Sequence, residues 1–485
     1  MSAMPLPAPT DLTDLDASAL SNLIHARQVS CREVMQAYLA RIHALNPRLN
    51  AIVNLAPDEA LLAQAGACDA ELAGGASRGW LHGIPQAIKD ACDAEGFPTT
   101  KGCTLLADAV APRDSVMTQR MKAAGCIVIG KTNLPELGLG SHTFNKVFGA
   151  TPNAWDATVS AGGSSGGAAV ALARRLLPVA DGSDFMGSLR NPAGWNHVFG
   201  MRPTQGRVPA GPGPDIWIDQ LPPKARWRVA CATWAACWPP SPATMRGCRF
   251  HCSADWTPEA ADPARALRGL KIGWLGNLNG YLAMDDGVLQ VCRDALGHMA
   301  QAGAVVEDIA LGMDPGELWD CWLTWRRALV GPRVHALIGL PGAREAIKPE
   351  ALWEYEGSQG LSFLDFMRAS QVRSRYYQHM RGLLAQWDVV ALPSAQVWPF
   401  PVAERWPRQI AGRAMDTYHR WMEATLYATL AGLPAISLPA GFHAQHGWPM
   451  GVQLIAAHSA DALLLRVAAG YEAVRGDFIA LRPQE

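Results

Sequence analysis

The sequence lacks an excess of either charge, a long apolar run and a secretory leader. Its 42 Lys and Arg residues nearly balance its 43 Asp and Glu residues, which leaves a formal net charge of −1. This balance does not favour nucleic acid or an anionic membrane surface as a partner. No apolar run reaches the ~20 residues that span a bilayer, and residues 1–14 contain neither the basic nor the apolar part of a signal peptide. We therefore expect a cytoplasmic protein with a small-molecule partner, no nucleic acid and no membrane.

Charged residues are also scarce, and the cysteines do not suggest a disulfide framework. Charged residues make up 18% of the chain and apolar residues 49%, which is typical of compact globular proteins rather than disordered ones. The eleven cysteines are an odd number, and most lie singly within apolar patterns. We expect reduced thiols, and a chain of 485 residues is long enough for a large core and a cleft.

The arrangement of apolar residues predicts helices first and alternating strands and helices afterwards. Residues 15–75 show helical periodicity, with Ser30 and Glu33 spaced as a capping box. We expect residues 1–75 to pack as a helical segment on a single fused α/β domain, 76–485. The expected strands are 84–88, 126–129, 270–275, 304–309, 389–393, 433–439 and 450–455, and the expected helices include 115–124, 168–176, 286–302 and 418–430.

Two glycine-rich loops have the composition of functional turns. Residues 161–167 read Ala-Gly-Gly-Ser-Ser-Gly-Gly and lie between strand-like and helix-like sequence, which is unusual for a flexible linker. The run lacks the Gly-Lys-Ser/Thr ending of a phosphate-binding loop. Residues 181–192 form a second such turn, in which Ser188 follows Ser164 by 24 residues. Backbone N–H groups in such a turn can converge on an oxyanion, as acyl transfer requires.

A lysine at the end of an apolar run supplies a possible base for these serines. Lys89 closes the run Gly-Ile-Pro-Gln-Ala-Ile-Lys at residues 83–89. A lysine that closes a buried strand is desolvated, which lowers its pKa and makes the neutral amine accessible. A serine, serine and lysine set in this arrangement indicates nucleophilic catalysis. His142 and His419 do not lie in a Ser-His-Asp pattern, so a catalytic histidine is the weaker interpretation.

These motifs resemble those of the amidase signature family, over about residues 19–214 and 270–473. The resemblance implies a large twisted mixed β-sheet covered on both faces by α-helices. It also implies amide hydrolysis through an acyl-enzyme, with Ser188 as nucleophile, Ser164, preceded by a cis peptide bond, as proton relay and Lys89 as base. No cofactor and no metal are expected. The residues implied as oxyanion donors are Phe185, Met186, Gly187 and Ser188, and those implied as supports are Ser165, Asp184 and Arg190.

The substrate pocket and the oligomeric state are less well indicated. The resemblance places Leu139 and Gly140 in the substrate cleft, and Trp398 and Tyr418 form an aromatic pocket in one interpretation and ordinary core in the other. Met186 stands where many family members have glycine, and we interpret it as a residue that shapes the substrate site. The expected partners are an amide and water, with a homodimer left open.

Two other functions remain as alternatives. The first is the glutaminase-type subunit of a tRNA-dependent amidotransferase, although residues 183–187 read Ser-Asp-Phe-Met-Gly where that subunit usually has Thr-Asp-Thr-Gly-Gly. The second is a catalytically impaired protein that keeps the fold. The intact set of Lys89, Ser164 and Ser188 argues against impairment.

Residues 221–256 do not fit the rest of the sequence. They hold four cysteines and four tryptophans, and residues 221–240 show neither helical nor strand periodicity. We hypothesise that this segment is translated from a shifted reading frame that is restored near Thr257. The rival interpretation, a zinc site at Cys231, Cys237, Cys248, His251 and Cys252, lacks a strong ligand spacing.

Overall fold

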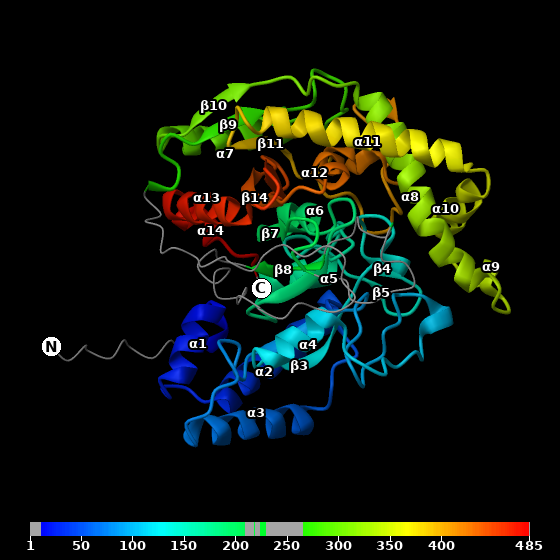
Figure 1. Cartoon of the computed structure of the whole chain (residues 1–485). Helices are drawn as coiled ribbons and strands as arrows, with labels where there is room; N and C mark the ends of the chain where they lie inside the picture. The colour runs from blue at the N-terminus through cyan, green and yellow to red at the C-terminus, as the bar shows by residue number, and fades with distance from the viewer. Residues whose placement is uncertain (1–10, 209–217, 219–223, 229–264, 485) are drawn as a thin grey trace.

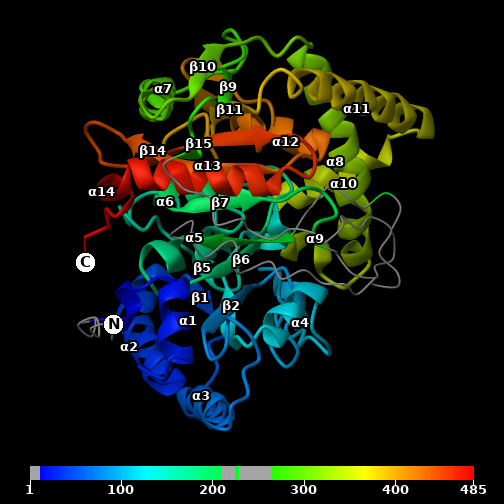
Figure 2. The same cartoon turned by 60° about the vertical axis from the view of Figure 1, so that its left-hand side comes forward.

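The computed structural model describes residues 11–208, 218, 224–228 and 265–484. Its first part, drawn in blue and cyan in Figures 1 and 2, packs helices around a small sheet at one end of the molecule. The strands of this sheet lie in the order β1 (Ile52–Val53), β3 (Ile127–Thr132) and β2 (Pro85–Lys89). Its helices are α1 (Ala17–His25), α2 (Cys31–Leu49), α3 (Asp58–Ala73) and α4 (Val116–Ala123).

Local sequence explains where α2 begins and ends. The Ser30 side chain accepts from the Glu33 N–H while the Glu33 carboxylate accepts from the Ser30 N–H, which confirms the predicted capping box. Asn50 ends the helix in the left-handed conformation, at φ 47°. The residues of α2 that face inward are apolar, and they pack in one core with β2 and β3.

The rest of the chain forms a mixed eight-stranded sheet. The strand order is β10 (Val305–Asp308), β9 (Lys271–Trp274), β11 (Val389–Pro393), β15 (Pro449–Ala456), β14 (Ala435–Phe442), β7 (Phe199–Arg202), β8 (Lys224–Arg228) and β6 (Ala180–Ser183). Strands β10, β9 and β11 pair with one another in parallel. All later neighbours in this order, starting with β11 and β15, pair in antiparallel fashion. Short hairpins are β4 (Phe144–Asn145) with β5 (Gly149–Ala150), and β12 (Gln409–Ile410) with β13 (Arg413–Ala414).

Helices cover both faces of this sheet, so the predicted α/β fold is confirmed. Every residue of β11 and β15 is buried, which requires cover on both sides. The described helices of this part are α5 (Gly166–Ala173), α6 (Arg190–Asn196), α7 (Val288–Gln301), α8 (Pro315–Ile338), α9 (Ala343–Ala346), α10 (Pro349–Gln359), α11 (Phe363–Leu383), α12 (Leu426–Ala431), α13 (Asp461–Val474) and α14 (Gly476–Ile479). None of the helices in the described ranges is long and apolar enough to cross a membrane.

The structure interrupts one expected helix and contains one strand that the sequence did not predict. The expected helix over 418–430 is a 3-10 helix, η6 (Arg420–Thr425), followed by α12, because the backbone at Met422 leaves helical geometry at φ −113°, ψ 19°. Within the segment predicted to be without periodicity, β8 is a strand that pairs with β6 and β7. Strand pairing uses backbone groups, so it does not require an alternating sequence. The remainder of that segment, including the candidate zinc ligands, lies outside the described residues.

The described core contains two large hydrophobic clusters that meet at α6, and a smaller third cluster that includes Leu139, Val330 and Tyr418. One contains apolar residues between Ala17 and Val198, and the other contains apolar residues between Met186 and Ile479. On α6, Ala193 belongs to the first cluster and Trp195 to the second. The loop that carries Ser188 therefore leads directly into the helix shared by both clusters.

Candidate active site

Lys89 lies at the end of β2 with its ammonium group among three serine hydroxyls. Its Nζ donates to Ser164 Oγ at 2.8 Å, to Ser165 Oγ at 2.7 Å and to Ser183 Oγ at 3.0 Å. Burial lowers the pKa of Lys89 to about 8, against smaller opposing effects of nearby acidic groups. The Asp181 carboxylate accepts from the Lys89 backbone N–H at 3.2 Å and fixes the strand end. Neither Ser183 nor Asp181 was singled out for these contacts from the sequence.

The Ser164 loop is held rigidly by neighbouring side chains. The peptide bond between Gly163 and Ser164 is cis, as the resemblance implied. Thr143 Oγ1 donates to the Gly162 carbonyl at 2.8 Å, and the Gly163 N–H donates to Ser141 Oγ at 3.2 Å. These bonds tie the loop to its neighbours before any substrate is bound.

A buried ion cluster shapes the turn that ends in Ser188. Arg190 donates from Nε to Asp184 Oδ2 and from Nη2 to Asp184 Oδ1, both at 3.0 Å. It also donates to Thr429 Oγ1 at 3.2 Å and to Gln453 Oε1 at 2.6 Å. Burial raises the pKa of Asp184, but the charges of Arg190 and Arg202 and the hydrogen bonds outweigh it and lower the pKa to about 2.

One of the four predicted oxyanion donors, the N–H of Gly187, already has a hydrogen-bond acceptor within the protein. The Gly187 N–H donates to Asp184 Oδ1 at 2.8 Å, because an ionised carboxylate is a strong acceptor for a turn N–H. In the described part of the chain, no hydrogen bond occupies the N–H groups of Phe185, Met186 or Ser188. Gly187 instead has a conformational role, since its φ is +84° and a Cβ there would lie 2.3 Å from Thr425 Oγ1.

The two serine loops meet through the backbone. The Ser165 N–H donates to the Ser188 carbonyl at 3.3 Å, and both Ser164 and Ser188 are nearly buried. The described hydrogen bonds do not include one between the hydroxyls of Ser164 and Ser188. Lys89, Ser164, Ser165 and the Ser188 loop thus lie together, as the sequence predicted.

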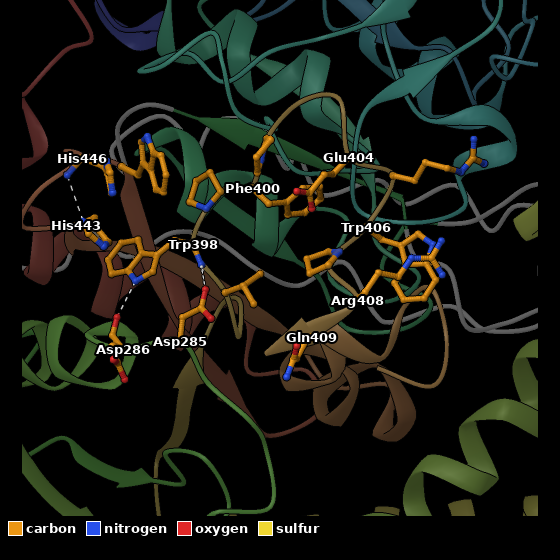
Figure 3. Close-up of a pocket in the computed structure, with 16 residues that line it drawn as sticks. Asp285, Asp286, Trp398, Phe400, Glu404, Trp406, Arg408, Gln409, His443 and His446 are labelled. Atoms are coloured by element: carbon orange, nitrogen blue, oxygen red, sulfur yellow. Dashed lines mark hydrogen bonds between the residues drawn. The ribbon is translucent and has the colours of Figure 1, made fainter. Parts of the chain in front are cut away.

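The four predicted substrate residues divide between two cavities. Leu139, Gly140 and Tyr418 line a small one, whereas Trp398 lines a separate pocket of about 790 Å³ (Figure 3). The small cavity is close to the Ser164 loop, because Ser141, which lines the cavity, accepts from the Gly163 N–H at 3.2 Å. Trp398 therefore does not line the cavity that Leu139, Gly140 and Tyr418 share.

Helix α8 contributes residues beside the Ser188 turn that sequence reasoning missed. The Phe185 ring packs 5.0 Å from the Trp322 ring, between ring centroids. The Arg326 guanidinium lies 5.4 Å from the Phe185 centroid and donates to the Tyr418 hydroxyl, which donates to Glu354 Oε1 at 2.6 Å. The spacing of Trp319, Trp322 and Arg326 along one helix was the available sequence signal.

Met186, His142 and His419 are all buried among other protein groups. Met186 is buried in the second core cluster and does not have positive φ, so the side chain causes no backbone strain. His142 is fixed between Ser160 Oγ at 2.7 Å and the Val402 carbonyl at 2.9 Å. His419 is fully buried against aromatic rings, and burial lowers its pKa. Among the described residues, no cluster of three or more metal-ligating side chains is found.

This chain is similar over most of its length to proteins of one known family. The profile of the amidase family matches residues 33–325 and 342–465. The glutamyl-tRNA(Gln) amidotransferase A subunit of Ralstonia nicotianae is 33% identical, over 95% of this chain and 98% of the relative. An acylamidase of Rhodococcus erythropolis is 32% identical, over 95% of each chain. A bacterial aryl acylamidase of the amidase signature family superimposes with a TM-score of 0.87 at 26% identity, over 97% of this chain and 99% of the other. The chain therefore belongs to the amidase signature family and is a hydrolase that acts on amide carbon–nitrogen bonds.

Proposed function

We propose that this enzyme hydrolyses its amide through an acyl-enzyme at Ser188, with Ser164 as proton relay and Lys89 as general base. The observation that carries the proposal is the buried Lys89 ammonium group, 2.8 Å from Ser164 Oγ and with its pKa lowered to about 8. A neutral amine in this position can accept the Ser164 proton. The backbone contact between Ser165 and Ser188 brings the nucleophile loop to the relay.

The reaction follows from these positions. Ser188 Oγ bonds to the amide carbon while its proton passes to Ser164, whose own proton passes to Lys89. This step requires the hydroxyls of Ser188 and Ser164 to lie within hydrogen-bond distance of each other. The tetrahedral intermediate then breaks its carbon–nitrogen bond, and the leaving amine takes the proton back. Water, deprotonated by the same relay, attacks the ester carbon and releases the acid and Ser188.

The oxyanion is proposed to be held by the N–H groups of Phe185, Met186 and Ser188. These groups lie in the turn whose shape is set by Gly187 and by the Asp184 carboxylate. Each donor aimed at a developing oxyanion contributes about 2.7–4 kcal/mol to transition-state stabilisation. Gly187 and Asp184 act by positioning, since they hold the turn and do not reach the oxyanion.

The substrate we propose is a small amide with an aromatic group. Phe185, in the nucleophile turn, packs on the fully buried Trp322 ring, and Tyr418 lines the small cavity. Rings of this kind bind flat apolar groups by offset or edge contacts. The names of the acylamidase and aryl acylamidase relatives agree with this class. Water is the second substrate, and the cytoplasm is the proposed location.

The test is amine release from aryl, aliphatic and peptide amides by the purified protein and by Ser188→Ala. We expect hydrolysis of aryl amides that Ser188→Ala abolishes. A fluorophosphonate probe should label Ser188 in the unmodified enzyme, as located by peptide mass spectrometry. Full hydrolysis by Ser188→Ala, with a normal melting temperature, would exclude this serine as nucleophile. Labelling of another serine would do the same.

A second candidate is the glutaminase-type subunit of an amidotransferase, because several similar relatives are named as amidotransferase subunits. It predicts that glutamine, rather than an aryl amide, is hydrolysed and that partner subunits raise the rate. Glutaminase activity of the protein alone and with the partner subunits of a relative distinguishes the two functions. Aryl amide turnover without any partner favours the stand-alone enzyme.

A further inference from the structure

A pocket of about 790 Å³ lies outside the lysine and serine cluster (Figure 3). It is an open hollow bordered by the loop 397–409, the turn 443–448 between β14 and β15, and Asp285 and Asp286 just before α7. None of the residues assigned to the acyl-enzyme reaction lines it. A pocket of this volume is in the range that holds a small organic ligand.

Indole rings form fixed walls of this pocket. Trp398 Nε1 donates to the Asp286 carbonyl at 2.9 Å, and the Trp398 N–H donates to Asp285 Oδ2 at 3.2 Å. Trp448 Nε1 donates to Asp156 Oδ2 at 2.9 Å. Because hydrogen bonds hold these rings, a ligand would not need to order them on binding.

Three carboxylates line the same pocket: Asp285, Asp286 and Glu404. Within the described ranges, none of the three takes part in an ion pair. Burial raises the pKa of Asp285, and the charge of Asp286 raises it further. Two adjacent carboxylates beside an aromatic ring therefore lack a compensating cation in the described part of the chain.

The basic groups of the pocket compensate this charge only in part. Arg405 is already paired with Glu350, with 3.0 Å between Nε and Oε1. Arg408 lies over Trp406, with its guanidinium carbon 3.7 Å from the ring centroid. Burial, followed by the effect of His446, lowers the pKa of His443, which disfavours a positive charge on this imidazole. One guanidinium thus remains against three carboxylates.

We propose that this pocket binds a small organic ammonium ion, with its charge at Asp285 and Asp286 and its hydrocarbon part against Trp398. Carboxylates supply the opposite charge, and the face of an indole attracts a cation through its quadrupole. Recognition of an ammonium group by aromatic rings and carboxylates discriminates strongly against a neutral molecule of the same shape. The proposal concerns binding alone and does not depend on the acyl-enzyme mechanism.

The ammonium ion has two sources that the enzyme's reaction suggests. The pocket and the small cavity at Leu139 and Gly140 share Arg405 and Trp406, so the two spaces are neighbours. Amide hydrolysis releases an amine, which is protonated at neutral pH, so the ligand is either this part of the substrate or a separate amine. Both have the same chemistry at the pocket.

The test is isothermal titration of the full chain with choline and with its neutral isostere 3,3-dimethylbutan-1-ol. We expect saturable binding of choline that is at least tenfold tighter than that of the alcohol. The double variant Asp285→Asn with Asp286→Asn should weaken choline binding at least tenfold. Asp294→Asn, an exposed carboxylate on α7 that does not line the pocket, is the matched control and should bind as the unmodified protein does.

Three results would overturn the proposal: no choline binding, equal binding of choline and the alcohol, or unchanged affinity in a double variant with a normal melting temperature. Trp398→Leu is a second variant, expected to weaken choline binding without removing a charge. Inhibition of amide hydrolysis then distinguishes the sources. Competitive inhibition by choline assigns the pocket to the amine part of the substrate, and non-competitive inhibition assigns it to a separate amine.

Discussion

At the scale of single residues, the protonation of Lys89 sets the expected pH dependence. In the proposed mechanism the neutral amine is the base, and burial brings the pKa of Lys89 to about 8. The active fraction therefore grows as pH rises, and we predict that kcat/KM increases from pH 6.5 and levels off above about pH 8. Lys89→Met should lower kcat by about 10²–10⁴-fold, as expected for loss of a general base. A rate that is flat or falls from pH 6.5 to 9 would contradict this role.

Asp184 provides a prediction about stability in acid. Its pKa is about 2 in the folded protein, against an ordinary value of 3.8, so its stabilising contribution is present above about pH 4 and is lost as pH falls towards 2. Asp184→Asn leaves Arg190 and Arg202 buried without their carboxylate, and we expect a loss of about 3–5 kcal/mol at pH 7. Denaturant unfolding measures the difference.

Its control is Asp308→Asn, which removes an exposed partner of Arg293. An exposed ion pair contributes about 0–1 kcal/mol, so this variant should unfold almost as the unmodified protein does. If Asp184→Asn were equally mild, the buried cluster would not be what holds the Ser188 turn.

Some of these residue positions could be predicted from sequence and others could not. Lys89 closes an apolar strand and the serines lie in unusual glycine loops, so local sequence was enough to select them. The contact of Ser183 with Lys89 depends on how β6 approaches β2, which requires the fold. The sequence did not show that the Gly187 N–H is already hydrogen-bonded, because this depends on how the Asp184 side chain folds back within the turn.

At the scale of elements, the residues before α10 join two loops that line the small cavity. Lys348 Nζ donates to the Leu139 carbonyl at 2.6 Å, and its N–H donates to Glu136 Oε1 at 2.9 Å. Two residues later, Glu350 pairs with Arg405. This segment therefore positions both the loop beside Ser164 and the loop 397–409.

We predict that Lys348→Met raises KM for aryl amides by about 10-fold and changes kcat less, because it loosens a substrate loop and not the base. Lys348→Arg, which keeps a donor, should recover part of the loss. Steady-state kinetics with both variants measures the split. A fall in kcat alone would mean that Lys348 acts on the chemical step.

The elements that sequence predicted poorly were set by tertiary contacts. Strand β11 was predicted at its observed bounds because a strand that is buried on both faces is a short apolar run. The helix expected over 418–430 was broken at Met422, which is buried in the core and has non-helical backbone angles. Strand β8 was not predicted because it pairs with β6 and β7 through backbone groups, which do not require an alternating side-chain pattern.

The hypothesis of a shifted reading frame for 221–256 concerns residues that lie mostly outside the described ranges. Resequencing the gene beside those of close relatives should show two compensating shifts that flank the segment. An uninterrupted alignment of the nucleotide sequences across this region would remove the hypothesis.

At the scale of the whole molecule, the two core clusters predict a cooperative loss of structure. Trp195 is fully buried, stacks on Trp421 with 5.6 Å between centroids, and donates to the Val397 carbonyl at 3.2 Å. Trp195→Ala should lower the free energy of unfolding by about 3–5 kcal/mol. Leu364→Ala, at a side chain that is 62% exposed, should change it by less than about 0.5 kcal/mol. Calorimetry checks both variants.

The bonds of Arg190 have a consequence for the order in which the protein is made. During synthesis, the N-terminal cluster is complete once Val198 has left the ribosome, and domains fold from the N-terminus first. Arg190, however, finds its acceptors at Thr429 and Gln453, which are translated more than 200 residues later. In a nascent chain, Arg190 can therefore pair with Asp184 of its own turn well before its contacts with α12 and β15 exist, so the last two bonds at this turn form only when synthesis is nearly complete.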